Sequence, residues 1–351
     1  MTDLTTQLIE QVNDANAQRH TLAIEGNGTK AHLGRQITCD QTLSLGRHTG
    51  VTDYSPDELY ITARAGTKVS EVQALLAENR QTLAFDPPHF NQQATLGGTL
   101  AANLSGPGRP WLGSGRDMLL GVKLINGLGE YLTFGGQVMK NVAGYDVSRL
   151  QAGAMGTLGV ITELSLKVVP MAETELTCVL DLGADSAITK MNQLGALPLP
   201  FSGMMWLSNQ LYIRLSGEAS AVKAAAQTIG GQPCDGDIWQ AVREQTHSFF
   251  SGRSKTWRFS LASTAPNALP EAPWLIEWGG SQRWLRGDSE WQRLSQIAEE
   301  NLGQVSLIHG AQADEERFQT PAEPLVRLQK RLKDAFDPHY TLNPGRLYHW
   351  M

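Results

Sequence analysis

Residues 92–117 read QQATLGGTLAANLSGPGRPWLGSGRD, and this stretch, rich in glycine and alanine, decides how the first half of the chain is interpreted. Clustered glycines let backbone N–H groups converge on an anion, because no Cβ stands in the way. The segments 25-EGNGTK-30 and 153-GAMGTLGVI-161 have the same character. Together the three loops indicate a cradle for a dinucleotide. For any one loop alone, tight turns and close strand packing account for the glycines equally well.

The sequence lacks the patterns of other nucleotide-binding folds. No GxGxxG lies between an early strand and a helix with an acidic residue about 20 positions later, so a Rossmann fold is disfavoured. A Walker loop is also absent from the sequence. The net charge of -6 and the pI near 5.8 provide no broad basic surface, so we expect no nucleic-acid partner.

The pattern around the glycine loops predicts an α+β domain over residues 1–170. The expected helices are 3–18 and 67–80. The expected strands are a short strand that runs into a glycine turn within 21–30, then 41–45, 58–66, a hairpin at 118–134 and 159–169. Pro170 ends the last of these strands, and we place the domain boundary there.

Residues 171–322 predict a second domain whose order resembles a ferredoxin-type βαββα unit, followed by a further round of helices and strands. We expect an antiparallel sheet with helices on one face. A helix at 323–336 opens the last segment, 323–351, which is expected to return to the first domain. Six tryptophans between 239 and 291 indicate either a subunit interface or a tryptophan-rich core.

The sequence carries no signal for export, a membrane span or a metal cluster. The first 20 residues lack a cationic start followed by an apolar core, and no apolar run approaches about 18 residues. Cys39, Cys178 and Cys234 lie far apart, which predicts no zinc site, iron–sulfur cluster or disulfide framework. We therefore expect a cytoplasmic protein without a metal of its own.

The series EGNGTK, DPPHFNQQATLGGTLAANLSGPGRPWLGSGRD, KNVAGYD, GTLGVIT and LNPGR resembles the flavoproteins of the vanillyl-alcohol-oxidase type. The resemblance covers residues 20–170 and the tail, and within the family it is greatest to the FAD-binding subunits of bacterial glycolate oxidases. It implies a PCMH-type FAD-binding domain of two subdomains, followed by a smaller cap domain with an antiparallel sheet.

The resemblance also implies which residues hold FAD. The pyrophosphate loop would be Gly26, Asn27, Gly28 and Thr29, and the next FAD segment Pro88, Thr95, Gly97, Gly98, Ala101 and Asn103. The adenosine half would contact Gly156, Thr157, Gly159 and Ile161, and the C-terminal turn near the flavin ring would be Asn343, Pro344 and Gly345. For Asn343, a simple turn role before proline is an equal alternative.

Three further residues, Lys140, Asn141 and Tyr145, match another stretch of the family. His48 and Cys39 precede the second loop, where some members anchor flavin covalently. A surface histidine and a small buried cysteine are the commoner roles of such residues, so we expect FAD to be bound non-covalently.

Oxidation of a 2-hydroxy acid requires a base, a positive group for the carboxylate and a hydride acceptor. Catalytic members of the family carry an HxGDGNxH-like stretch, whereas here 308-IHGAQADEE-316 holds His309 with no second histidine. Arg109, Arg116 and His309 are the catalytic candidates. Roles as solvated arginines and a structural histidine suit them at least as well.

The resemblance implies an FAD-binding subunit of a complex that oxidises glycolate and D-lactate to 2-oxo acids. Its partners would be a larger catalytic FAD subunit and an iron–sulfur subunit, through which the complex could lie peripherally on the inner membrane. Two alternatives stay open. One is a self-sufficient FAD-dependent 2-hydroxy-acid dehydrogenase, and the other is a non-catalytic FAD-binding assembly subunit.

Overall fold

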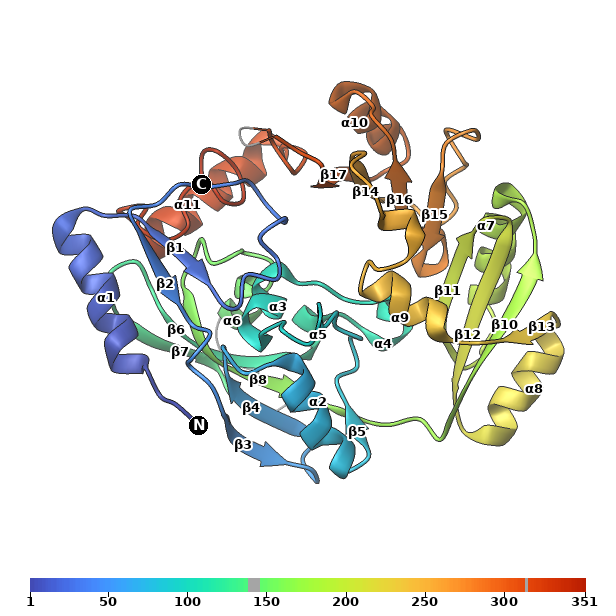
Figure 1. Cartoon of the computed structure of the whole chain (residues 1–351), viewed down its shortest axis with the longest axis horizontal. Coiled ribbons are helices and arrows are strands. Elements are labelled where there is room, and N and C mark those ends of the chain that lie inside the picture. The colour runs from blue at the N-terminus through green and yellow to red at the C-terminus, as the bar shows by residue number, and fades with distance from the viewer. Residues whose placement is uncertain (138–145, 313–314) are drawn as a thin grey trace. The chain divides into compact units, whose positions relative to one another are not determined.

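The computed structural model describes residues 1–137, 146–312 and 315–351, which form two compact units (Figure 1). The first unit comprises Met1–Leu104, Ser114–Pro170 and Gln312–Met351, and the second comprises Ser105–Gly113 and Met171–Ala311. Lys140, Asn141 and Tyr145 lie outside the described residues.

The two units differ from the expected domains in two short segments. Ser105–Gly113 belongs to the second unit, where the Gly106 carbonyl accepts a hydrogen bond of 3.1 Å from Trp278 Nε1. Residues 312–322 belong to the first unit, in which Glu316 forms an ion pair of 2.9 Å with Arg35. Neither segment has a hydrophobic periodicity from which its contacts in the fold could have been predicted.

The first unit contains a five-stranded antiparallel sheet in the order β3-β4-β8-β6-β7 and a parallel pair, β1-β2. Its strands are β1 (Leu22–Glu25), β2 (Gln41–Ser44), β3 (Val51–Ser55), β4 (Tyr60–Arg64), β5 (Gln81–Thr82), β6 (Leu119–Ile125), β7 (Tyr131–Gly135), β8 (Val160–Lys167) and β9 (Val169–Pro170). Its helices are α1 (Thr5–Gln18), α2 (Val69–Glu78), α3 (Leu96–Ala102), α5 (Gly115–Met118), α6 (Val147–Gln151) and α11 (Glu323–Phe336).

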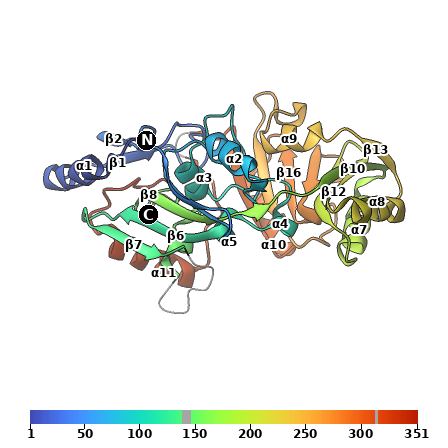
Figure 2. The same cartoon turned by 90° about the horizontal axis from the view of Figure 1, so that it is seen from below.

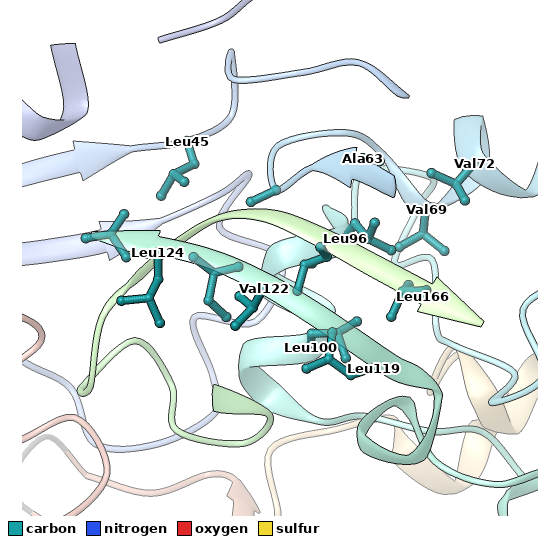
Figure 3. Packing of buried hydrophobic residues seen from close by; sticks show 14 of the residues in the cluster. Leu45, Ala63, Val69, Val72, Leu96, Leu100, Leu119, Val122, Leu124 and Leu166 are labelled. Atoms are coloured by element: carbon teal, nitrogen blue, oxygen red, sulfur yellow. The ribbon is translucent and has the colours of Figure 1, made fainter. Parts of the chain in front are cut away.

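The core of this unit lies between the five-stranded sheet and the helices α2 and α3. Val69, Val72 and Leu76 recur at helical spacing on α2, and all three are fully buried. Figure 3 shows Leu96 and Leu100 of α3 beside the side chains of β6 and β8. Helix α11 lies beside β7, as Figure 2 shows, and the ring centroids of Phe134 and Phe336 are 6.3 Å apart there.

Helix α3 occupies the glycine-rich stretch that sequence reasoning treated as a loop. Thr95 caps it, because its Oγ1 accepts the Gly98 N–H at 3.2 Å. Two glycines in one short helix lower its intrinsic propensity. Burial of Leu96 and Leu100 overrides that penalty, so the segment is helical.

The second unit is built on an eight-stranded sheet in the order β13-β10-β12-β11-β15-β16-β14-β17, with every pair antiparallel. Its strands are β10 (Thr174–Asp181), β11 (Phe201–Leu207), β12 (Gln210–Gly217), β13 (Gln232–Cys234), β14 (Thr256–Ser260), β15 (Trp274–Glu277), β16 (Gln282–Arg286) and β17 (Gln304–His309). Its helices are α4 (Arg109–Leu112), α7 (Ala184–Gly195), α8 (Ala219–Ile229), α9 (Asp237–Arg243) and α10 (Trp291–Glu300), with 3-10 turns η1 (Ser248–Phe250) and η2 (Trp278–Gly280).

Helices α7, α8 and α10 share one hydrophobic core with one face of this sheet. Trp257 and Trp274 belong to that core, so part of the tryptophan cluster has a structural role. The opposite face carries α9, whose buried Trp239 donates from Nε1 to Thr177 Oγ1 at 3.0 Å. This contact adds a helix to the face that we expected to be free of helices.

Candidate functional site

A cavity of about 300 Å³ lies within the first unit and is lined by the three glycine loops and the C-terminal tail. That volume is at the lower end of the usual range for small-molecule sites. Twelve of the predicted FAD-binding residues line it, namely Gly26, Asn27, Gly28, Thr29, Thr95, Gly97, Gly98, Ala101, Gly156, Gly159, Ile161 and Asn343. The folding of the chain therefore brings together segments that are more than 300 positions apart.

The first loop presents backbone donors to this cavity. The N–H groups of Asn27, Gly28 and Thr29 donate to no acceptor among the residues that the structure describes. Gly28 has a φ of +69°, a conformation that suits glycine and that turns successive N–H groups toward one point. These donors make the loop suitable for a phosphate.

The lining carries more positive than negative charge. Lys30 lies on it with its Nζ 3.3 Å from Thr29 Oγ1 and 5.3 Å from the centroid of the Phe90 ring. Arg346 also lines the cavity, and Glu25 is the one carboxylate among the described lining residues. The balance favours an anionic ligand.

The second loop differs from the expectation that its N–H groups are free. Gly97 donates to the Ala65 carbonyl at 2.8 Å, and Gly98 donates to Thr95 Oγ1. Glycine serves close packing here, because a Cβ at position 97 would lie 2.6 Å from the Cβ of Ala65. A Cβ at position 98 would meet only Thr95 Oγ1, at 3.0 Å, so Gly98 leaves open space at the cavity.

Asn343 joins the tail to two walls of the cavity. Its Oδ1 accepts the Ile24 N–H at 2.7 Å, and its Nδ2 donates to the Met155 carbonyl at 2.7 Å. Its φ of +42° is left-handed, a conformation that asparagine tolerates better than most residues. The side chain is thus a buried crosslink between β1 and the third glycine loop, which goes beyond a simple turn role.

Arg346 fastens the same tail to the first loop region. Its guanidinium donates to the carbonyls of Arg35 at 2.9 Å and Ala31 at 3.1 Å. Burial lowers the pKa of Arg346, and the neighbouring positive charge of Arg317 lowers it further. Sequence reasoning missed this residue, although it lies only three positions after Asn343 in the LNPGR motif.

A buried ion pair stabilises the C-terminal tail. Lys333 and Asp337 are both inaccessible to solvent, and Lys333 Nζ donates to Asp337 Oδ2 at 2.6 Å. Lys333 Nζ also donates to the carbonyls of Thr157 and Leu342, each at 2.8 Å. Burial lowers the pKa of Lys333, which the carboxylate of Asp337 opposes. A lysine and an aspartate four positions apart on a helix usually form an exposed pair, so this role could not be predicted from their spacing.

Five predicted FAD-binding residues, one of them Pro344 in the tail, do not line the cavity. Pro88 is buried in a coil, and Asn103 ends α3 and accepts the Arg116 N–H through its Oδ1. Thr157 is buried and donates to the Ala154 carbonyl. Gly345 has a positive φ of 76° in the tail.

The three catalytic candidates are not brought together. Arg116 is exposed on α5 of the first unit, whereas Arg109 and His309 belong to the second. His309 is half-buried, and its Nε2 lies 2.7 Å from Gln245 Oε1, as expected for a structural histidine. None of the three lines the cavity.

His48 and Cys39 do not line the cavity either. His48 is buried, and its Nδ1 accepts the Leu4 N–H at 3.0 Å. Burial lowers the pKa of its imidazole. Within the described ranges, no three His, Cys, Asp or Glu residues group as metal ligands would, and no helix is both long and apolar enough to span a membrane.

Comparison with known proteins agrees with this geometry. The FAD binding domain family matches residues 4–135. The glycolate oxidase subunit GlcE of Escherichia coli strain K12 is 42% identical over 346 residues, which is 99% of this chain and 98% of that protein. The glycolate oxidase subunit GlcD of Bacillus subtilis strain 168 is 34% identical over 122 residues, 34% of this chain and 26% of that protein. The structure of alkyldihydroxyacetonephosphate synthase matches with a TM-score of 0.66 at 14% identity, over 97% of this chain and 75% of that one, and shows the same fold.

These findings confirm FAD as the cofactor and the predicted fold class. The described residues of the first unit fit FAD on their own evidence as well. The lining has three backbone N–H donors without an acceptor among the described residues and more positive than negative charge. Its Gly98 leaves one wall without a side chain.

Proposed function

The chain belongs to the family of glycolate oxidase subunits that includes GlcE, and on this premise we propose that it is the FAD-binding subunit of a complex that oxidises a 2-hydroxy acid such as glycolate or D-lactate. The proposal depends above all on the cavity of the first unit, whose lining joins backbone donors at Asn27, Gly28 and Thr29 to the tail residue Asn343. The product would be the corresponding 2-oxo acid.

Each wall of the cavity has a separate task in this proposal. The N–H groups of residues 27–29 would hold the pyrophosphate, with Lys30 adding positive charge. Gly98 and Ala101 would let the body of the cofactor lie against α3, and Asn343 would fix the distance between β1 and the third loop. FAD supplies the acceptor for the hydride that leaves the alcohol carbon.

We further propose that the chain works beside a larger catalytic FAD subunit and an iron–sulfur subunit. The three cysteines of this chain are far apart in sequence, so clusters that carry electrons onward would belong to a partner. The relative GlcD bears the name of another glycolate oxidase subunit, which supports an assembly of different chains. We place the complex in the cytoplasm, with any membrane contact made through the partners.

The test is an absorbance spectrum of the purified chain, alone and with its partner subunits, before and after anaerobic addition of glycolate. We expect flavin bands in the chain alone and substrate-dependent bleaching in the complex. Gly98→Leu should remove the flavin bands while the far-UV circular dichroism stays unchanged, because the new side chain would enter the cavity. Gly195→Leu at the end of α7, where a Cβ would meet nothing within 4 Å, is the matched control.

Three results would contradict the proposal. Absence of flavin after reconstitution with FAD would remove the cofactor role of the cavity. Full activity of a complex whose Gly98→Leu subunit holds no flavin would make this FAD dispensable for oxidation. Bleaching of the isolated chain at the turnover rate would indicate a self-sufficient dehydrogenase.

A further inference from the structure

The turn that precedes α3 contains three consecutive residues with a left-handed backbone. Phe90, Asn91 and Gln92 have φ of +43°, +55° and +61°, and none of them is glycine. This conformation brings the Cβ atom close to the following carbonyl oxygen, so it is costly for most side chains, although asparagine tolerates it. A run of three such residues persists only where its surroundings enforce it, often beside a functional site.

One link joins this turn to the first glycine loop through the backbone. Within the turn, the Phe90 carbonyl accepts the Gln93 N–H at 3.2 Å, and the His89 carbonyl accepts the Ala94 N–H at 2.9 Å. Asn27, which lines the FAD cavity, donates from Nδ2 to the Gln93 carbonyl at 2.9 Å. The turn is therefore fastened to the loop whose N–H groups face the cofactor.

The ring of Phe90 makes a second link to the same loop region. Its centroid lies 5.3 Å from Lys30 Nζ, which is above the ring, and 5.9 Å from the centroid of the His32 imidazole. An ammonium group within about 6 Å of an aromatic centroid is attracted to the negative face of the ring. The His32 and Phe90 rings meet at 88° in a T-shaped pair, which limits the rotation of the phenyl group. The ring thus restrains the ammonium group of Lys30.

Lys30 needs such a restraint because its side chain is long and flexible. It lines the cavity next to Thr29, whose Oγ1 is 3.3 Å from Lys30 Nζ. Immobilising a lysine side chain when a ligand binds costs conformational entropy. A contact that already holds the ammonium group before FAD arrives removes part of that cost. The position of the Phe90 ring therefore affects how tightly the cavity can hold an anion.

We propose that Phe90 is a positioning residue for the cofactor: its ring holds the Lys30 ammonium group at the first loop, where the pyrophosphate of FAD would lie. The left-handed turn serves to present that ring. The proposal rests on the FAD role of the cavity set out above. Phe90 acts through Lys30, because its side chain has neither a charge nor a hydrogen-bonding group and does not line the cavity.

The experiment measures the affinity of the full-length chain, after removal of its flavin, for FAD by isothermal titration calorimetry. Phe90→Leu removes the aromatic face but keeps an apolar side chain, whereas Phe90→Tyr keeps the face. Lys30→Met removes the ammonium group, and it is also combined with Phe90→Leu. The matched control is Phe134→Leu, since Phe134 is a half-buried phenylalanine of the same unit, on β7, that does not line the cavity.

We expect Phe90→Leu to weaken FAD binding by about 3- to 10-fold, in line with a partly desolvated cation–π contact. Phe90→Tyr and the control should bind FAD within about 2-fold of the wild type, because both keep the aromatic face above which Lys30 lies. In a chain that already carries Lys30→Met, adding Phe90→Leu should change the affinity by less than about 2-fold, since the group that it positions is gone.

Two results would overturn the positioning role. One is equal FAD binding by the wild type and Phe90→Leu. The other is an equal loss from Phe90→Leu with and without Lys30→Met, because Phe90 would then act on the fold and not through the ammonium group. Should Phe90→Leu fail to fold by circular dichroism, Phe90→Met takes its place in the same cycle, because methionine fills irregular space. A wild type that binds no FAD would instead remove the cofactor role of the cavity, and the positioning role with it.

Discussion

Replacing Lys333 by methionine should destabilise the first unit strongly. The ammonium group donates to Asp337 Oδ2 and to the carbonyls of Thr157 and Leu342, and the site is inaccessible to solvent. Methionine would leave three acceptors without this donor. Removing one partner of a buried ion pair costs about 3–5 kcal/mol. For a unit of this size, each kcal/mol lowers the melting temperature by about 2–4 °C, so we expect a loss of roughly 6–20 °C.

The assay is differential scanning calorimetry of the chain with and without FAD. Lys330→Met is the control, because Lys330 is exposed on the same helix. Its Nζ lies 5.5 Å from the centroid of the Trp350 ring. Since Asp337 also accepts the N–H groups of Thr341 and Leu342, adding Asp337→Leu should not restore full stability. A melting temperature for Lys333→Met within about 3 °C of the control would refute this account of the tail.

Three further predictions concern the walls of the cavity and the first helix. Gly97→Ala should lower the free energy of unfolding by about 2 kcal/mol or more, because its Cβ would lie 2.6 Å from that of Ala65, whereas Gly98→Ala should be nearly neutral. Urea unfolding compares the two variants, and equal midpoints of their unfolding transitions would contradict the packing role of Gly97. Asn343→Asp should lower the free energy of unfolding by about 2–3 kcal/mol and weaken FAD binding, because a carboxylate oxygen would face the Met155 carbonyl. This loss of stability should shrink as the pH falls toward about 4, and a loss independent of pH would count against the role of Asn343. The free energy of unfolding should fall as the pH drops below about 6.5, since the unfolded state then binds a proton on His48 that the buried ring, with its lowered pKa, does not; Asp3 and Glu163 oppose this shift and Arg64 adds to it. His48→Asn, which can still accept the Leu4 N–H, should flatten that dependence, and identical pH profiles would show that His48 is not its source.

Regular periodicity in the sequence was enough to predict most of the elements. The hairpin expected at 118–134 appears as β6 and β7, and the strand expected at 159–169 appears as β8. Helix α3 could not be predicted in this way, because its glycines favour a loop and only the burial of Leu96 and Leu100 makes it helical. Local patterns report propensity, whereas long-range packing decides such segments.

The candidate site shows the same division. The loops around Gly28, Gly98 and Gly156 could be found because clustered glycines stand out in a sequence and have a direct physical meaning for the backbone. Their roles in holding FAD stay predictions. Lys333 and Arg346 were missed because each donates to backbone carbonyls, among them the distant ones of Thr157 and Arg35, and a carbonyl leaves no mark on the sequence.

The crosslink made by Asn343 also constrains the order of events during synthesis. Its partner Met155 leaves the ribosome 188 residues earlier, and the whole segment from Met171 to Ala311 is made in between. The first unit must therefore wait with one wall missing, whereas the second unit has all its residues once Ala311 is made, because its short segment Ser105–Gly113 is made earlier. Because domains generally fold as their residues emerge, the later-encoded unit is placed to finish first, and FAD can be captured only afterwards.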